Sequence, residues 1–396
     1  MRNYFEFENR AKINCGEDAA RTLGAELVRH GAKKPFVLFS IDAVRSGVAD
    51  RALSSIRGGR KGSAVCFDGV PNAVDKEIAR DMKASFQKHE CDAIVAVGGA
   101  FVLDYAKVLK LFLSQKCDDL IPIAGTYKAV GDAIPMFFLP TELSLGAELN
   151  GSVTDGDTYV SSPEMVPTVL FIDRDFAEKK PLRSLAEGSI YALANAIEAY
   201  LGAEEDDPAE IYAEKAIRLL FKHGVKAAER AGNKEAATGV ALASALAGVA
   251  FGNVPFGAAH ALSDAISEIT GVSKPQAMTL AFIATLKNLD ENSIKRLENL
   301  VKTLNLEEEV AKTQEESELA SEFESSKKEQ GAVDILESWV DALSDVAGVT
   351  TKISQTDIQR ETFGDIATSA QGKRAAIGGV RTLSKEDFIA ILNNAY

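Results

Sequence analysis

A pair of glycines stands where a predicted strand passes into a predicted helix. The apolar run AIVAV is followed by GGAFVLDYAKVLK, so Gly98 and Gly99 open the helix. Backbone N–H groups at such a helix start, together with the helix dipole, can hold the pyrophosphate of a dinucleotide. A tight strand-to-helix turn, which any doubly wound fold needs, explains the same two glycines. Both interpretations stay open.

A histidine with a carboxylate at helical spacing is a second candidate for chemistry. His260 is one of only four histidines, and Asp264 follows it four residues later on a predicted helix. That spacing allows a carboxylate–imidazole contact on one helix face. An oriented imidazole could move a proton during catalysis, but a histidine kept for packing and hydrogen bonding would show the same spacing.

The glycine pair lies in a part of the chain where predicted strands alternate with predicted helices. Four short apolar runs suit buried strands, namely FVLF at 36–39, AIVAV at 93–97, MFFL at 136–139 and TVLFI at 168–172. Helical patterns separate most of them, which predicts a doubly wound parallel sheet. Turn signals at Asp155-Gly156 and Ser162-Pro163 predict a hairpin at the end of this part.

The second part of the chain predicts almost only helix. From Pro181 onward Ala, Leu, Glu and Lys recur at helical spacing, with expected breaks at Gly224, Gly232, Gly271 and Pro275. We therefore expect two domains, an α/β nucleotide-binding-like domain over 1–180 and an α-helical domain over 181–396. The charged stretch at 305–330 predicts solvent-facing helices and a mobile connection.

The most apolar segment, VALASALAGVAFGNVPFGAAHAL, is long enough to cross a membrane. Asn253, Pro255 and His260 interrupt it, and its alanines and glycines suit close packing between helices. We therefore expect two buried core helices separated near Asn253–Pro255, and no membrane span.

Composition narrows the function classes. The chain has 396 residues, 46% hydrophobic and 26% charged, which is typical of a soluble globular protein with two domains. A net charge of −14 repels phosphate backbones and anionic lipids, so neither nucleic acid nor a membrane is an expected partner. Four cysteines without a CxxC pair, and no leader at the first residues, favour a cytoplasmic location.

Five ordered segments resemble the iron-containing (group III) alcohol dehydrogenase family. Two carry its cofactor motifs: GGAFVLDYAK resembles GGGSxxDxAK and LPTELSLGAE resembles PTTAGTGSE, with matches at Gly98, Gly99, Asp104, Ala106, Lys107, Pro140, Thr141, Gly146 and Glu148. Three lie further on: YALANAIEAY resembles DALxHAIEAY, AGVAFGNVPFGAAHAL resembles AGxAFxNxxxGxxHAxAH, and the segment from Arg381 resembles NPRxLTxEDIxxIL.

The resemblance implies a dehydroquinate synthase-like fold, with an N-terminal dinucleotide-binding α/β domain and an all-α C-terminal domain. It implies NAD or NADP as cofactor and hydride transfer between a small alcohol and an aldehyde or ketone. In the family a divalent metal polarises the substrate oxygen. Family members commonly associate through their first strands, so a homodimer is expected.

Cofactor-binding residues are implied by the same motifs. They are Gly98, Gly99, Asp104, Thr141 and, for the adenosine ribose, either Asp42 or Ser40. Thr141, Ser144 and Glu148 could line the adenosine side, although Glu148 could instead cap a following helix.

The family's metal ligands are mostly replaced. One Asp and three His are expected, but the corresponding residues are Tyr191, Asn195, His260 and Lys274. An iron or zinc site needs about three protein ligands, so we predict no catalytic metal. Asp264 also replaces the family's second cleft histidine, which removes the usual proton shuttle.

The predicted cofactor-binding loop also departs from the family pattern. Ala100 and Phe101 replace the family's third glycine and its serine, which crowds the pyrophosphate path and removes a hydroxyl donor. Asp157 stands where family members carry a basic residue, and its carboxylate would repel a dinucleotide.

Lys274 has two interpretations. Its ammonium, with Tyr191 and Asn195, could polarise a carbonyl oxygen as Tyr–Lys pairs do in metal-free reductases. Alternatively it fills the vacated metal space and pairs with Asp264 or Glu198.

Two functions therefore remain. The first is a metal-free, NAD(P)-linked oxidoreductase with Lys274, Tyr191 and His260 as catalytic candidates, for which maleylacetate reductases are a precedent. The second is a catalytically inactive family member that serves as a binding or scaffolding protein. A cleft rebuilt for another small ligand is a weaker third hypothesis.

Overall fold

The computed structural model describes residues 6–58, 64–71, 75–126, 134–155, 158–176, 181–204, 207–255, 257–316, 331–373 and 382–396. The chain divides into two compact units by its contacts. One is Glu8–Lys179, and the other is Lys180–Tyr396 together with Met1–Phe7. Asp157 and Arg381, both named above, lie outside the described residues.

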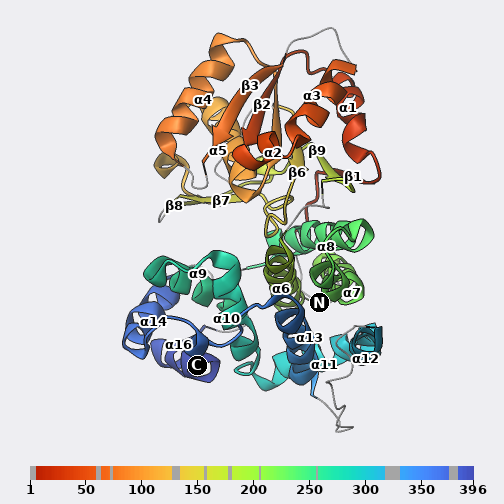
Figure 1. Ribbon diagram of the computed structural model, residues 1–396. Helices are drawn as coiled ribbons and strands as arrows, with labels where there is room; N and C mark the ends of the chain where they lie inside the picture. The colour runs from red at the N-terminus through yellow and green to blue at the C-terminus, as the bar shows by residue number, and fades with distance from the viewer. Residues whose placement is uncertain are drawn as a thin grey trace. The chain divides into compact units, whose positions relative to one another are not determined.

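The first unit is built on a parallel sheet (Figure 1). Its described residues give six strands in the order β1-β9-β6-β4-β2-β3, and every neighbouring pair is parallel. Their bounds are β1 Lys12–Gly16, β2 Pro35–Ser40, β3 Val65–Val70, β4 Ala93–Gly98, β6 Met136–Pro140 and β9 Val169–Asp173. β2, β4, β6 and β9 are the four predicted apolar runs, as expected for strands buried on both faces.

Helices cover both faces of this sheet (Figure 1). They are α1 Leu23–Arg29, α2 Ile41–Arg45, α3 Val48–Gly58, α4 Lys76–Lys88 and α5 Ala100–Ser114. On one face, Leu27 of α1 and Ile56 of α3 share a buried cluster with Val95 of β4. On the other face, Phe86 of α4 meets Phe36 of β2 with ring centroids 5.9 Å apart. The predicted doubly wound α/β architecture is confirmed.

The predicted hairpin is present as β7 Ser152–Asp155 paired antiparallel with β8 Thr158–Ser161. β5 Gly125–Thr126 runs parallel to β8, so the hairpin belongs to a separate small sheet. The turn residue Gly156 lies outside the described part of the chain.

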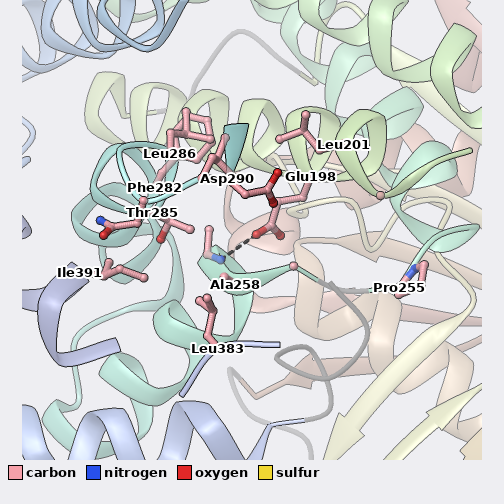
Figure 2. A pocket seen from close by; sticks show the side chains of 15 residues that line it. Glu198, Leu201, Pro255, Ala258, Phe282, Thr285, Leu286, Asp290, Leu383 and Ile391 are labelled. Carbon is pink, nitrogen blue, oxygen red and sulfur yellow. Dashed lines mark hydrogen bonds between the residues drawn. The ribbon is translucent and has the colours of Figure 1, made fainter. Parts of the chain in front are cut away.

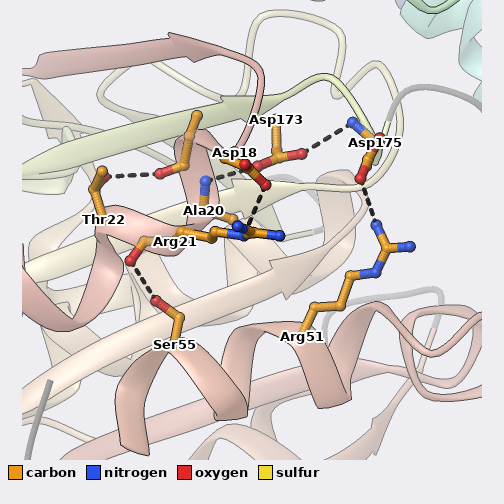
Figure 3. Close-up of polar contacts among 9 residues, drawn as sticks. Asp18, Ala20, Arg21, Thr22, Arg51, Ser55, Asp173 and Asp175 are labelled. Carbon is orange, nitrogen blue, oxygen red and sulfur yellow. Dashed lines mark hydrogen bonds and ion pairs between the residues drawn. The ribbon is translucent and has the colours of Figure 1, made fainter. Parts of the chain in front are cut away.

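Carboxylates tie the last strand of the main sheet to the first helices (Figure 3). Asp173 at the end of β9 is buried and accepts hydrogen bonds from the amides of Ala20 at 2.7 Å and Asp175 at 2.9 Å. The Asp175 side chain in turn pairs with Arg51 of α3 at 2.9 Å. These bonds hold the chain that follows β1 against the carboxyl end of its parallel neighbour β9.

The described part of the second unit is helical, as predicted. The helices are α6 Leu182–Gly202, α7 Pro208–Glu229, α8 Lys234–Gly252, α9 Ala258–Thr270, α10 Lys274–Leu286, α11 Glu291–Leu304, α12 Leu306–Glu316, α13 Ala332–Ala347, α14 Phe363–Gly372 and α16 Lys385–Ala395. The charged stretch supplies α12, and its residues 317–330 lie outside the described residues.

One predicted helix break is wrong. Gly224 lies inside α7, where a Cβ would come 2.6 Å from Cζ2 of Trp339 on α13, so this glycine permits a close helix contact. Gly271, in contrast, ends α9 in the left-handed conformation at φ 74°.

The long apolar segment forms two helices, α8 and α9, separated at Asn253–Gly257. Among the described helices, α8 alone is long and apolar enough to cross a membrane, and 61% of its most apolar window is buried. It packs against α6 and α7, as a core helix does.

Candidate functional site

The first candidate site lies at the carboxyl ends of β2 and β4. The chain places β3 on one side of β2 and β4 on the other, so its direction across the sheet reverses between these strands. In open α/β sheets, ligands bind outside the carboxyl ends at such a switch point. Ser40 ends β2 and Gly98 ends β4, and Oγ of Ser40 is 3.0 Å from where a Cβ on Gly98 would stand. Gly98 thus lets the start of α5 approach β2 closely.

Gly99 is the N-cap of α5 and is also closely approached. Any side chain at this position would overlap the carboxylate of Glu142, which follows β6. Glu142 is exposed. Glu142 is not among the site residues predicted from the sequence. It stands at the second threonine of the PTTAGTGSE pattern, and this replacement of threonine by glutamate was the signal that could have identified it.

Asp104 and Lys107, the DxAK pair of the cofactor motif, form an ion pair in which Lys107 is buried and Asp104 is partly exposed. The Lys107 side chain is fully buried, and its Nζ lies 3.2 Å from Oδ1 of Asp104. The same ammonium donates to Oδ1 of Asn150 at 3.0 Å and to the carbonyl oxygen of Ser152 at 3.1 Å. These contacts tie α5 to the start of β7, and a cofactor role for Asp104 stays a prediction.

The other predicted cofactor-binding residues lie near the carboxyl ends of the strands of the same sheet. The amide of Thr141 donates to the carbonyl of Gly98 at 3.0 Å, which holds it beside the glycine pair. Asp42 is exposed in the first turn of α2, and Ser40 caps that helix by accepting from the amide of Ala43 at 3.0 Å. Both alternatives for the ribose therefore lie at the carboxyl end of β2.

Glu148 does not cap a following helix, because the next element is the strand β7. It is buried, and Oε1 accepts from the amide of Ser144 at 2.8 Å. Glu148 thus closes the turn between β6 and β7.

The second candidate site lies around His260 in the helical unit. His260 is buried in the first turn of α9, and its Nδ1 is hydrogen-bonded to Oε2 of Glu198 on α6. An ionised carboxylate only accepts, so Nδ1 is the donor. The imidazole stacks on Phe251 with centroids 4.2 Å apart and meets the Tyr191 ring edge-on at 5.3 Å. The carboxylate partner of His260 is therefore Glu198, whereas the sequence spacing had suggested Asp264.

Glu198 also caps α9. Its Oε1 accepts from the amide of Ala259 at 2.7 Å, so one buried carboxylate fixes both the helix start and the imidazole. The same side chain borders a mostly apolar pocket of about 50 Å³, which Phe282, Leu286 and Ile391 also line (Figure 2).

Lys274 pairs with Asp264, one of the two carboxylates expected of it in a structural role. Their charged atoms lie 3.1 Å apart, and the side chains are 51% and 36% exposed. Tyr191 and Asn195 lie buried one turn apart on α6. The sequence-based catalytic candidates thus separate into a buried group at Tyr191 and His260 and an exposed ion pair at Lys274.

The four residues at the family's metal positions do not fit a divalent ion. An ammonium has no lone pair to donate, and the amide and phenol are poor ligands for iron or zinc. Within the described ranges, no group of three or more His, Cys, Asp or Glu side chains is placed to hold a metal.

Comparison with known proteins gives two family matches. The family model described as iron-containing alcohol dehydrogenase matches residues 10–174, and the model of the C-terminal domain of Fe-containing alcohol dehydrogenases matches residues 185–396.

A relative of similar sequence is the NAD-dependent methanol dehydrogenase of Bacillus methanolicus. It is 27% identical over 269 residues, which cover 66% of this chain and 69% of the relative. The chain thus spans about two thirds of the length of such curated relatives.

Solved structures share the fold. A 1,3-propanediol oxidoreductase matches with a TM-score of 0.84 at 22% identity over 100% of both chains. Sulfoacetaldehyde reductase from Bifidobacterium kashiwanohense, solved in complex with NAD+, matches with a TM-score of 0.81 at 18% identity over 99% of this chain and 98% of that chain. With both halves of its sequence matched, the chain belongs to the iron-containing alcohol dehydrogenase family.

Proposed function

We propose that this protein is an NAD(P)-linked oxidoreductase that transfers a hydride between a small alcohol and its aldehyde or ketone without a metal ion. Family membership and the glycine turn at the switch point of the sheet support the cofactor. The observation that carries the proposal is the buried Glu198–His260 pair. It holds an oriented imidazole at the single family ligand position that is still a histidine.

The cofactor supplies the hydride chemistry, and the chain's own residues bind and orient. Gly98, Gly99 and the first amides of α5 would hold the pyrophosphate, with Thr141 beside them. Asp104 and one of Asp42 or Ser40 are the further cofactor contacts implied by the motifs.

Proton transfer falls to the group around His260. Donation from Nδ1 to Glu198 orients the ring, so Nε2 would exchange a proton with the substrate oxygen. Tyr191, edge-on to that ring, is a second donor. Lys274, held by Asp264, adds positive charge that would polarise a carbonyl.

Calorimetric titration with NADH and NADPH tests the proposal, followed by turnover on a panel of small aldehydes and ketones. We expect saturable binding of at least one cofactor and reduction of at least one substrate. His260→Gln should lower turnover by about 100-fold, the scale of a lost general acid. Flat titrations with protein shown by its melting curve to be folded would rule the proposal out.

A catalytically silent binding protein is the second candidate. The observation that favours it is the Lys274–Asp264 ion pair, in which the carboxylate already pairs with the ammonium that would otherwise act on a substrate. It predicts no turnover at saturating reduced cofactor. Hydride transfer that is abolished by His260→Gln or Lys274→Met would eliminate it.

We also infer a homodimer formed through β1. This strand is at the edge of the described main sheet, paired on one side with β9, and its second edge suits pairing with another copy. Light scattering should give the mass of two chains, and the mass of one chain would contradict the inference.

A further inference from the structure

The helical unit contains a pocket that the proposed reaction does not use, although Glu198 borders it. Residues of α6, α9, α10 and α16 and of the turn before α11 enclose this pocket (Figure 2). Its volume is about 50 Å³. A water-sized group takes roughly 10–15 Å³ of such a volume, so the pocket has room for about four non-hydrogen atoms.

Apolar side chains make up most of the pocket wall. Phe282 and Leu286 of α10 and Ile391 of α16 are almost fully buried, so the wall belongs to the packed core of the unit. Leu289 and Asp290 are only half-buried, so a ligand can enter the pocket beside them. A short hydrocarbon chain would be favoured against this wall because it leaves water.

Asp290 gives the pocket a negative charge. Its carboxylate caps α11 and accepts from three neutral donors, the amides of Asn292 and Ser293 and the hydroxyl of Ser293, each at 3.0 Å. The hydrogen bond from the Ser293 amide lowers the pKa of the Asp290 carboxyl, so this group is ionised at neutral pH. The described lining of the pocket includes no Lys, Arg or His side chain. Arg296, on the same helix, lies outside the lining and is paired with Glu210 at 2.7 Å.

Two further polar side chains of the lining favour a ligand that donates hydrogen bonds. Glu198 is a second carboxylate, already bonded to the amide of Ala259 and to His260, so it adds negative charge on the α6 side. Thr285 donates its hydroxyl hydrogen to the carbonyl of Ala281 at 2.8 Å, so toward a ligand it can only accept. Acceptors and negative charge beside an apolar wall match a small amphiphilic cation.

We propose that this pocket binds a short primary alkylammonium ion, with its ammonium group at the Asp290 carboxylate and a chain of about three carbons against Phe282, Leu286 and Ile391. An ammonium group carries one charge and three hydrogen-bond donors, whereas an alcohol of the same size offers one donor and no charge. The inference goes beyond the proposed function, because it requires neither the cofactor nor a proton from His260.

Saturation-transfer NMR titrations of the full chain, without cofactor and at constant ionic strength, test this inference. The probes are propylammonium, 1-propanol, which lacks the charge, and the ammonium ion, which lacks the chain and is followed by its competition with propylammonium. We expect saturable binding of propylammonium with a Kd in the millimolar range, as so few atoms allow. Both other probes should bind at least tenfold more weakly.

Three variants locate the bound ion. Asp290→Asn keeps a side-chain acceptor for the start of α11 and removes the charge, so propylammonium should bind about tenfold more weakly while 1-propanol is unaffected. Glu291→Gln removes the charge of the next residue, which is exposed and outside the lining, and should bind as the wild type does. Ala258→Val adds two methyl groups at the pocket wall and should abolish binding of propylammonium and 1-propanol. Melting curves establish that each variant is folded.

Several outcomes would overturn the inference. They are the absence of saturable propylammonium binding, an equal affinity for propylammonium and either other probe, an equal loss in Glu291→Gln, and unchanged binding in Ala258→Val. Since no cofactor is present, a failure here leaves the proposed oxidoreductase function as it stands. Flat titrations with NADH and NADPH would in turn leave the alkylammonium site unaffected.

Discussion

The helix starts at α5 and α9 differ in burial far more than in geometry. Each has a glycine N-cap and a glutamate from another segment in the space of the absent side chain. At α9 the carboxylate is buried and holds a histidine, whereas at α5 it is exposed. The same local arrangement is therefore part of the core at α9 and lies at the solvent-exposed surface at α5.

Loss of the buried carboxylate should have the largest effect on stability. Glu198→Ala leaves the amide of Ala259 and Nδ1 of His260 without their acceptor. We expect the free energy of unfolding to fall by about 3 kcal/mol, since each buried unsatisfied group costs roughly 1–3 kcal/mol. Urea unfolding measures this loss. Glu198→Gln keeps one acceptor and should lose less, so equal losses would show that hydrogen bonding is not the cause.

Substitution of each N-cap glycine by alanine tests the same comparison and should have the next largest effect on stability. Gly257→Ala pushes against the fixed Glu198 and should cost about 2 kcal/mol, typical of overpacking in a core. Gly99→Ala meets the end of the flexible Glu142 side chain at the solvent-exposed surface, so its cost should stay below about 1 kcal/mol. Thermal unfolding of the two variants gives the order. An equal or reversed order would mean that Glu142 is held as firmly as Glu198.

Removal of the exposed Glu142 carboxylate should have a smaller effect on the free energy of unfolding. Glu142→Ala loses a charge–dipole interaction at a helix start, worth about 0.5 kcal/mol at low salt. The loss should shrink as ionic strength rises, because salt screens exposed charges. Urea unfolding at low and high salt measures this loss, and a large salt-independent loss would contradict a solvent-screened interaction.

The exposed ion pair should have the smallest effect. Lys274 and Asp264 are both more than one third exposed, so Asp264→Asn should change stability by about 0.5 kcal/mol or less. Lys274→Gln removes the other charge of the pair. The double variant completes a double-mutant cycle, which measures the coupling energy between the two side chains. A coupling above about 1 kcal/mol would instead indicate a pair shielded from solvent.

Sequence patterns predicted the fold because they depend on burial, which repeats along each element. The apolar runs at β2, β4, β6 and β9 are typical of a parallel sheet covered on both faces, which is the arrangement observed. Gly224 was misassigned because its role depends on Trp339, more than 100 residues away on α13. Such a close approach leaves no local pattern.

The candidate sites were predicted only in part, for a similar reason. The motifs led to His260 and to the glycine turn, but the partners of these groups come from other segments. Glu198 was considered only as a partner of Lys274, and Glu142 was not considered. Helical spacing identifies neighbours within one helix and does not reveal carboxylates that reach in from α6 or from the end of β6.

In the proposed reaction His260, oriented by Glu198, transfers the proton and no metal ion takes part. This proposal is tested most directly by elemental analysis of the purified protein, with cofactor-dependent turnover measured before and after chelator treatment. We expect iron and zinc far below one per chain and the same turnover in both samples. Stoichiometric iron or zinc, removed together with activity, would contradict it.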